Sequence, residues 1–347
     1  MSLPILAPVF AVAGVVVWIA GIYVSKTTDV LSSRFHLGEA LGGAILLAIV
    51  TNLPEIAITA SGALRNQLDI ATGNILGGIA IQTVVLVLLD VAAMGKLAPL
   101  IGHAASLDLV LEAVLVIVML TITVAAHQLP DSLVWNGITP DGLLICGAWI
   151  AGLYLIGKAR GNLPWQSHGD APGGQRRRTQ VQKKEKNAAG KSSTPWAIIV
   201  FLIAAIATLA AGVVLQQTSE IIAKQLGLSG VVFGATILAA VTALPEISTG
   251  LAAVKLGDYK LAVSDIFGGN AFLPVIFIVA TLVSGKAVLP HATKPDMYLT
   301  ALGMLLTAVY VYGLIFRPRR QIARMGVDSF VVLVLYLLGI AGLFAIK

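Results

Sequence analysis

Ten long apolar segments constrain what this chain can fold into more than any other feature of the sequence. A helix needs about 20 apolar residues to cross the hydrocarbon core of a bilayer. Ten stretches meet this requirement, at residues 5–24, 37–64, 70–94, 105–126, 138–157, 195–217, 228–254, 261–284, 296–315 and 328–346. Only 12% of the 347 residues are charged, whereas a soluble domain has about a quarter. We therefore expect an all-α polytopic membrane protein whose first segment is a retained helix rather than a cleaved signal peptide.

One long polar stretch, residues 159–194, divides the ten segments five and five. It is rich in Gly, Ser, Gln and basic residues, and it is expected to be a mobile linker between residues 1–158 and 195–347. If this linker is cytoplasmic, 18 of the 23 Lys and Arg residues lie on the inner face, as the positive-inside rule requires. Both termini then face outward, and the second half is inverted relative to the first. The net charge of +6 thus reflects the excess of Lys and Arg in the inner loops, and we expect no binding of nucleic acid. The basic linker is a candidate for binding anionic membrane lipid.

The two halves of the chain contain an internal repeat. Residues 37–56 and 228–247, which are separated by a constant offset of 191, are identical at eleven of twenty positions. The same offset pairs residues 71–78 with 262–269, and these are identical at four of eight. Both copies of the first motif contain Thr-x-Leu-Pro-Glu-Ile, although a plain membrane helix avoids proline and glutamate. An inverted repeat with a broken, charged helix in each half is typical of secondary transporters.

Glu55 and Glu246 are the equivalent acidic residues of the two copies, and both lie well inside apolar segments. A carboxylate at the bilayer centre costs about 2.5–3.5 kcal/mol, and no Lys or Arg lies within a helical turn of either residue. The proline before each glutamate lacks an N–H group, so a carbonyl group one turn earlier is released from the helix. Carboxylates and freed carbonyl oxygens together suit hard cations such as Ca²⁺ or Na⁺. Two facing carboxylates can also share or exchange a proton.

Three functions are compatible with such a pair of glutamates: a coupled antiporter, an uncoupled cation channel and an intramembrane enzyme that uses the pair. The matched duplication favours the antiporter, and the sequence has no P-loop or common hydrolase motif. Gln82 lies deep in its segment and is expected to line the ion path, whereas Asp90 and Asp265 lie near segment ends and are expected at the membrane interface. Asp108 and Glu112 share one face of a helix and are treated as accessory. The histidines show no metal-ligand spacing, and a single cysteine is too few for a zinc or iron–sulfur site.

Two inverted five-helix halves, each with a Leu-Pro-Glu break followed by a Gly-rich helix, resemble the calcium:cation antiporter superfamily, and within it the sodium/calcium exchangers. The resemblance implies a non-enzymatic antiporter that exchanges Ca²⁺ or a related cation for Na⁺ or H⁺ by alternating access and needs no cofactor. We expect it in a prokaryotic plasma membrane. The resemblance also implies that two carboxylates and four backbone carbonyl groups bind the cation, from Glu55, Glu246, Thr51, Thr242, Ala48 and Ala239.

The sequence also departs from the exchanger pattern, which resembles Gly-Thr-Ser-Leu-Pro-Glu followed by Gly-Ser-Asn-x-Phe-Asn or its Asp variant. Val50 and Val241 replace the first glycine, and Asn52 and Ala243 replace the first serine. Gly78 and Gly269 replace the second serine, and Gln82 and Leu273 replace the final Asn or Asp. The alanine, both glycines and the leucine carry no side-chain oxygen for a sodium ion. Asn52, Gln82 and Asn270 are candidates to supply substitute oxygens. We therefore expect fewer sodium ions per cycle than in a typical exchanger, and a larger role for protons.

Overall fold

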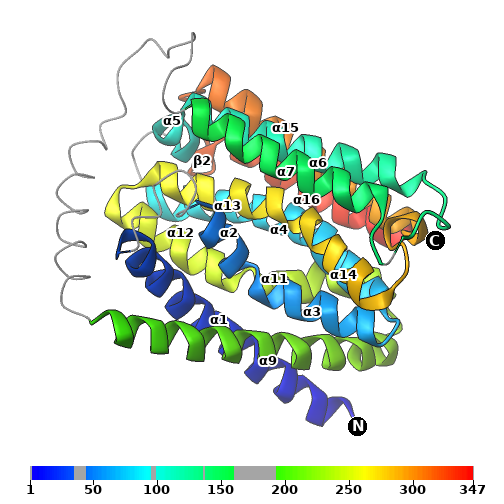
Figure 1. The fold of residues 1–347 in the computed structure, drawn as a ribbon. Helices are drawn as coiled ribbons and strands as arrows, with labels where there is room; N and C mark the ends of the chain where they lie inside the picture. The colour runs from blue at the N-terminus through cyan, green and yellow to red at the C-terminus, as the bar shows by residue number, and fades with distance from the viewer. Residues whose placement is uncertain (1, 35–43, 95–98, 136, 160–192, 347) are drawn as a thin grey trace.

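The computed structural model describes residues 2–34, 44–94, 99–135, 137–159 and 193–346, and it is built almost entirely of helices (Figure 1). Most of the expected linker, residues 160–192, lies outside the described residues. The elements in chain order are α1 (Leu3–Arg34), α2 (Ala44–Thr51), α3 (Leu53–Leu64), α4 (Leu68–Met94), α5 (Leu100–Ala104), α6 (Leu107–His127), α7 (Pro140–Ala159), α9 (Thr194–Leu226), α10 (Gly230–Phe233), the π-helix η2 (Gly234–Leu238), α11 (Ala239–Thr242), α12 (Leu244–Leu256), α13 (Tyr259–Phe272), the 3-10 helix η3 (Leu273–Val275), α14 (Ile276–Ser284), the 3-10 helix η4 (Leu289–His291), α15 (Lys294–Phe316), β1 (Gln321–Ile322), β2 (Met325–Gly326) and α16 (Val327–Ala345).

Eight helical stretches in the described part of the chain are long and apolar enough to cross a membrane. They are α1, α4, α6, α7, α9, the stretch from α13 to α14, α15 and α16. The stretch from α10 to α12 is a ninth candidate that bends by 41° at its break, and α3 is a shorter apolar helix. The chain is therefore a helical integral membrane protein. The ten-span arrangement as two inverted repeats stays a prediction.

Two helices extend well past their predicted ends. α1 has 32 residues and α9 has 33, where segments ending near residues 24 and 217 were expected. Both extensions carry polar side chains with partners: in the extension of α9, Glu220 accepts hydrogen bonds from Gln67 and Lys224. Nη1 of Arg34, the last residue of α1, donates a hydrogen bond to Oγ1 of Thr194, the first residue of α9, at 2.5 Å.

Asp90, which was expected at the membrane interface, lies near the end of α4 and is covered there by other parts of the chain. The residue is fully buried, and its two carboxylate oxygens accept backbone N–H groups from Leu100 and Gly326, each at 2.7 Å. The helix α5 and the antiparallel β1–β2 hairpin supply these two amides. Neither element was predicted from the sequence, and both cover the end of α4 that carries Asp90.

The helices are arranged around the two broken stretches. In Figure 1, α1 and α9 lie together along one face of the body, and α6 packs with α15 on the opposite face. Between them, α4 packs against α10, η2 and α13, and α2 packs against α13. The two ends of the chain lie on the same side of the body, opposite the end of α7 and the start of α9 (Figure 1).

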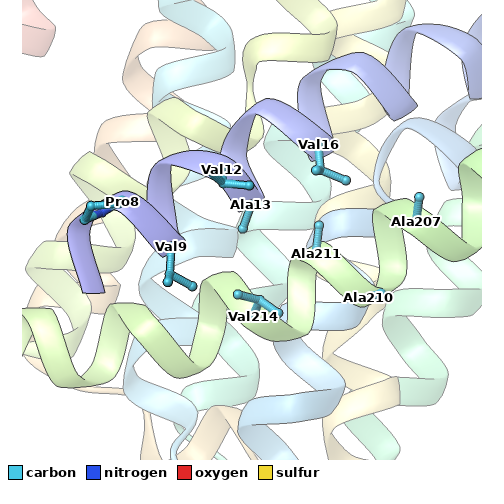
Figure 2. Close-up of a pocket in the computed structure, with 9 residues that line it drawn as sticks. All are labelled: Pro8, Val9, Val12, Ala13, Val16, Ala207, Ala210, Ala211 and Val214. Carbon is cyan, nitrogen blue, oxygen red and sulfur yellow. The ribbon is translucent and has the colours of Figure 1, made fainter. Parts of the chain in front are cut away.

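An open apolar groove of about 520 Å³ lies between α1 and α9 (Figure 2). Its lining consists of Pro8, Val9, Val12, Ala13, Val16, Ala207, Ala210, Ala211 and Val214. All nine side chains are hydrocarbon, so the groove offers no side-chain ligand to an ion. The polar groups that suit a cation are elsewhere in the protein.

Candidate functional site

The Thr-x-Leu-Pro-Glu motif breaks the helix in both halves, as its prolines predict. In the first half, Asn52 (φ −90°, ψ 18°) separates α2 from α3, and in the second half Ala243 (φ −81°, ψ −1°) separates α11 from α12. Each new helix has its proline in the first turn, where a missing N–H is tolerated. Glu55 and Glu246 therefore lie in the first turns of α3 and α12. The N-terminus of a helix stabilises negative charge through its free N–H groups. Both breaks therefore favour a carboxylate at these two positions.

The two glutamates lie in one buried polar region. Glu55 is 1% exposed and Glu246 is 3% exposed. Glu246 is within electrostatic range of Glu55 and of Asp265, and the Thr242 hydroxyl faces the Glu55 carboxyl group. Within the described ranges, Oε2 of Glu55 and both carboxylate oxygens of Glu246 have no hydrogen-bond partner. Carboxylates from the two motifs thus lie within electrostatic range of one another, and three of their oxygens have no partner among the described residues.

Three buried amide side chains of the broken stretches and of the helices packed on them also have oxygens without partners among the residues described. Asn52, Gln82 and Asn270 are each at most 1% exposed. Within the described part of the chain, each has a side-chain oxygen without a hydrogen-bond partner. Asn270 uses its Nδ2 to donate to Oγ1 of Thr83 at 3.1 Å, which leaves its Oδ1 available. A Cβ atom built on Gly269 would lie 3.5 Å from both Nδ2 of Asn52 and Oε1 of Gln82, so this glycine lets the two amides approach the second half of the chain.

The four backbone carbonyl groups that the resemblance assigns to the cation have different surroundings. The Ala48 carbonyl accepts Nδ2 of Asn52 at 2.7 Å and Oγ1 of Thr51 at 3.5 Å. The Ala239 carbonyl accepts Oγ1 of Thr242 at 3.3 Å and the N–H group of Ala243 at 3.1 Å. These two carbonyl groups therefore already accept hydrogen bonds. Thr51 and Thr242 are the last residues of α2 and α11, so their own carbonyl groups point to the helix breaks.

Asp265 is a further polar residue of this region. It was expected at the membrane interface, but its Oδ2 accepts Oγ1 of Thr249 at 3.0 Å, and it lies within electrostatic range of Glu246. The repeat contains the signal that was overlooked. Asp265 is offset by 191 from Asn74, whose Oδ1 accepts the Thr242 hydroxyl at 3.4 Å. Equivalent residues of the two halves thus both lie beside the broken helices.

The unpartnered oxygens indicate what this region binds. A buried polar atom without a partner costs about 1–3 kcal/mol, and six such oxygens come from five side chains here: Asn52, Glu55, Gln82, Glu246 and Asn270. All six are carboxylate or amide oxygens, which are ligands that hard cations prefer. Within the described ranges, no three His, Cys, Asp or Glu residues are grouped to hold a metal ion. The arrangement therefore suits a cation that two carboxylates and neutral oxygens share.

Two kinds of comparison identify relatives of this chain. The profile of the sodium/calcium exchanger protein family matches residues 5–158 and 194–345. The CaxA protein of Alkalimonas amylolytica is 25% identical over 299 residues, covering 85% of this chain and 86% of CaxA. The inner membrane protein YrbG of Escherichia coli (strain K12) is 24% identical over 305 residues, covering 88% of each chain.

Solved structures have the same fold. The H⁺/Ca²⁺ exchanger CAX superposes with a TM-score of 0.68 at 16% identity, covering 98% of this chain and 82% of that one. The sodium–calcium exchanger NCX_Mj superposes with a TM-score of 0.58 at 19% identity, covering 99% of this chain and 100% of that one. These neighbours are transporters rather than enzymes. The family match spans both halves of the sequence, and the chain belongs to the sodium/calcium exchanger protein family.

Proposed function

We propose that this protein is an antiporter that exchanges Ca²⁺, or a related divalent cation, for protons or sodium ions, with Glu55 and Glu246 as the central ligands. The observation that carries the proposal is the burial of these two carboxylates within electrostatic range of one another, with three oxygens unpartnered within the described ranges. Asn52 and Gln82 supply amide oxygens, and the carbonyl groups of Thr51 and Thr242 complete the set at the helix breaks. The carbonyl groups of Ala48 and Ala239 each accept two hydrogen bonds, and each would exchange one of these bonds for the cation.

The proposed architecture is ten spans in two inverted five-helix halves, residues 1–158 and 195–347, joined by the linker 159–194. Packing at the crossing of α4 and α13 supports it. A Cβ atom on Gly78 would lie 3.7 Å from Leu273, and one on Gly269 would lie 3.5 Å from Gln82. Gly78 and Gly269 are offset by 191, and so are Gln82 and Leu273. The two contacts are therefore the same contact made once by each half, as a twofold relation between the halves requires.

Polar contacts between loops support the proposed topology. Nζ of Lys286 donates to Oδ1 of Asn66 at 2.9 Å, and both residues belong to loops assigned to the outer face. Lys260 forms an ion pair with Asp108, and both lie at helix ends assigned to the inner face. Each contact joins chain segments that the positive-inside rule places on one side. On this topology both termini are outside and the linker is cytoplasmic.

Cysteine labelling tests the topology. In a Cys146→Ser background, Asp131→Cys is expected to react with a membrane-impermeant maleimide added to intact cells, because its loop is assigned to the outer face and its side chain is 64% exposed. Arg320→Cys, an exposed residue between α15 and α16, is expected to react only after the membrane is opened. Labelling of Arg320→Cys but not Asp131→Cys in intact cells would contradict the proposed orientation.

The coupling ion is proposed to be mainly the proton. Two glutamates within electrostatic range can exchange protons for a divalent cation. Sodium needs several oxygens placed in advance, and Leu273, a fully buried hydrocarbon side chain, occupies one position where the exchanger pattern has an oxygen. Ala243, Gly78 and Gly269 likewise offer no side-chain oxygen. The side-chain amides of Asn52 and Gln82 supply oxygens at two of these positions, but only in the first half of the chain.

Transport in proteoliposomes tests the coupling ion. Uptake of ⁴⁵Ca²⁺ is expected to follow an imposed pH gradient in sodium-free buffer, and to respond weakly to a sodium gradient at fixed pH. Steep sodium dependence with a Hill coefficient of about three, and no response to pH, would contradict proton coupling. Uptake that proceeds at the same rate without any counter-ion would instead indicate a channel and contradict the antiporter.

A further inference from the structure

A second buried carboxylate pair lies away from Glu55 and Glu246. Asp90 is fully buried near the end of α4, and Asp328 is 5% exposed in the first turn of α16. Asp90 lies eight residues beyond Gln82 on α4, which corresponds to about 12 Å along a helix. Nothing in the proposed transport mechanism uses these two residues.

Each of the two carboxylates is stabilised separately as an anion. Asp90 accepts backbone N–H groups from Leu100 and Gly326, each at 2.7 Å. Asp328 lies at the amide end of α16, where the helix dipole favours negative charge. Neither oxygen of Asp328 has a hydrogen-bond partner among the residues that the structure describes. Asp90 therefore has two backbone donors, whereas the buried carboxylate of Asp328 is left without a partner among the described residues.

The two carboxylates face the same small space. A Cβ atom on Gly326 would lie 3.3 Å from Oδ2 of Asp90 and would collide with Oδ1 of Asp328. The buried hydroxyl groups of Tyr310 and Ser329 lie 3.3 Å apart, and Tyr310 is within electrostatic range of both aspartates. In the described ranges, neither aspartate forms an ion pair with Lys or Arg. Two close buried anions without a basic partner need a counter-charge.

We infer that Asp90 and Asp328 form a second cation site, separate from the transport site, that binds one hard cation such as Ca²⁺ with help from Ser329 and Tyr310. All four side chains offer oxygen, the atom that such cations prefer. A bound cation would join α4, α15 and α16, and the amides on Asp90 connect it to α5 and the β1–β2 hairpin. On the proposed topology this is the cytoplasmic end of the bundle, so the site would respond to internal rather than external Ca²⁺.

Calcium titration of the purified full-length protein tests the inference. In the double variant Glu55→Gln/Glu246→Gln, calorimetry is expected to show one remaining Ca²⁺ per chain, and adding Asp328→Asn is expected to weaken it at least about tenfold. Asp141→Asn is the matched control, because Asp141 also lies in the first turn of a helix and is also 5% exposed. This control is expected to leave the remaining Ca²⁺ affinity unchanged. Ser329→Ala gives a second, milder test if Asp328→Asn does not fold.

The results separate this inference from the proposed function. If the double glutamine variant binds Ca²⁺ as the wild type does, while Asp328→Asn still removes one ion, the transport-site assignment fails and the second site stands. Absence of Ca²⁺ binding in the double variant overturns the second site. So does binding that neither Asp328→Asn nor Ser329→Ala weakens. Stabilisation of the protein by low pH alone, with no effect of Ca²⁺, also overturns it, because the pair would then hold a proton.

Discussion

Glu55→Gln and Glu246→Gln are each expected to lower the exchange rate at least about a hundredfold while the protein remains folded in the membrane. Each variant removes one of the two carboxylates proposed to bind the cation, and a hundredfold loss corresponds to about 2.8 kcal/mol, because each 1.4 kcal/mol is a factor of ten. The substitution keeps the shape of the side chain and removes a charge that costs about 2.5–3.5 kcal/mol at the bilayer centre. The free energy of unfolding should therefore hold or rise. Uptake of ⁴⁵Ca²⁺ and thermal unfolding in detergent measure the two effects.

Glu220→Gln provides the control for these variants. This variant makes the same Glu→Gln change on α9, where Glu220 accepts hydrogen bonds from Gln67 and Lys224, each at 2.6 Å. We expect it to retain exchange close to the wild-type rate, because it is outside the buried pair. Wild-type rates in both Glu55→Gln and Glu246→Gln would show that these carboxylates are not cation ligands.

Gly77→Val is expected to have the largest effect on stability. A Cβ atom at Gly77 would collide with Cα and Cβ of Ala235 in η2 and would lie 2.8 Å from its carbonyl oxygen. Backbone cannot move aside as a flexible side chain does, and overpacking of this kind costs about 3 kcal/mol or more. We expect a large loss of monodisperse protein on size-exclusion chromatography and a lower unfolding temperature. Both losses should occur whatever cation is present.

Gly147→Val is the matched control for this prediction. Gly147 lies inside α7, and a Cβ atom there would meet no other atom within 4 Å. The two variants share the low helix propensity of valine, so any difference between them reports the contact with Ala235. Equal unfolding temperatures for the two variants would show that α4 and η2 do not pack this closely.

The sequence predicts the broken helices well because the cause is local. Proline cannot donate a backbone hydrogen bond wherever it stands, so the breaks before Pro54 and Pro245 need no knowledge of the rest of the chain. The burial of the two glutamates is also predictable, since both lie in the middle of apolar segments. The membrane character of the chain and its family follow from the same segments and the repeated motif.

The surroundings of Asp90 could not be predicted in the same way. Its environment depends on the amide of Gly326, which lies 236 residues away in the sequence, and on two short elements without an apolar period. Distance from a segment end is a poor guide when other parts of the chain fold over that end. Asp265 is a different case, because comparison with Asn74 in the repeat would have placed it correctly. Equivalence within the repeat is a better guide to its neighbours than its position along the helix.

In the proposed alternating-access cycle, the unequal pair where α4 meets α13 and η3 would make the two sides of the membrane inequivalent. Gly269 meets the amide of Gln82, whereas Gly78 meets the hydrocarbon of Leu273. Two identical halves would present mirror-related free-energy profiles to an ion arriving from either compartment. In an alternating-access cycle, this chain instead offers a polar approach through one half and an apolar approach through the other. On this proposal, the apparent affinities measured from the two sides of the membrane are expected to differ even at zero membrane potential.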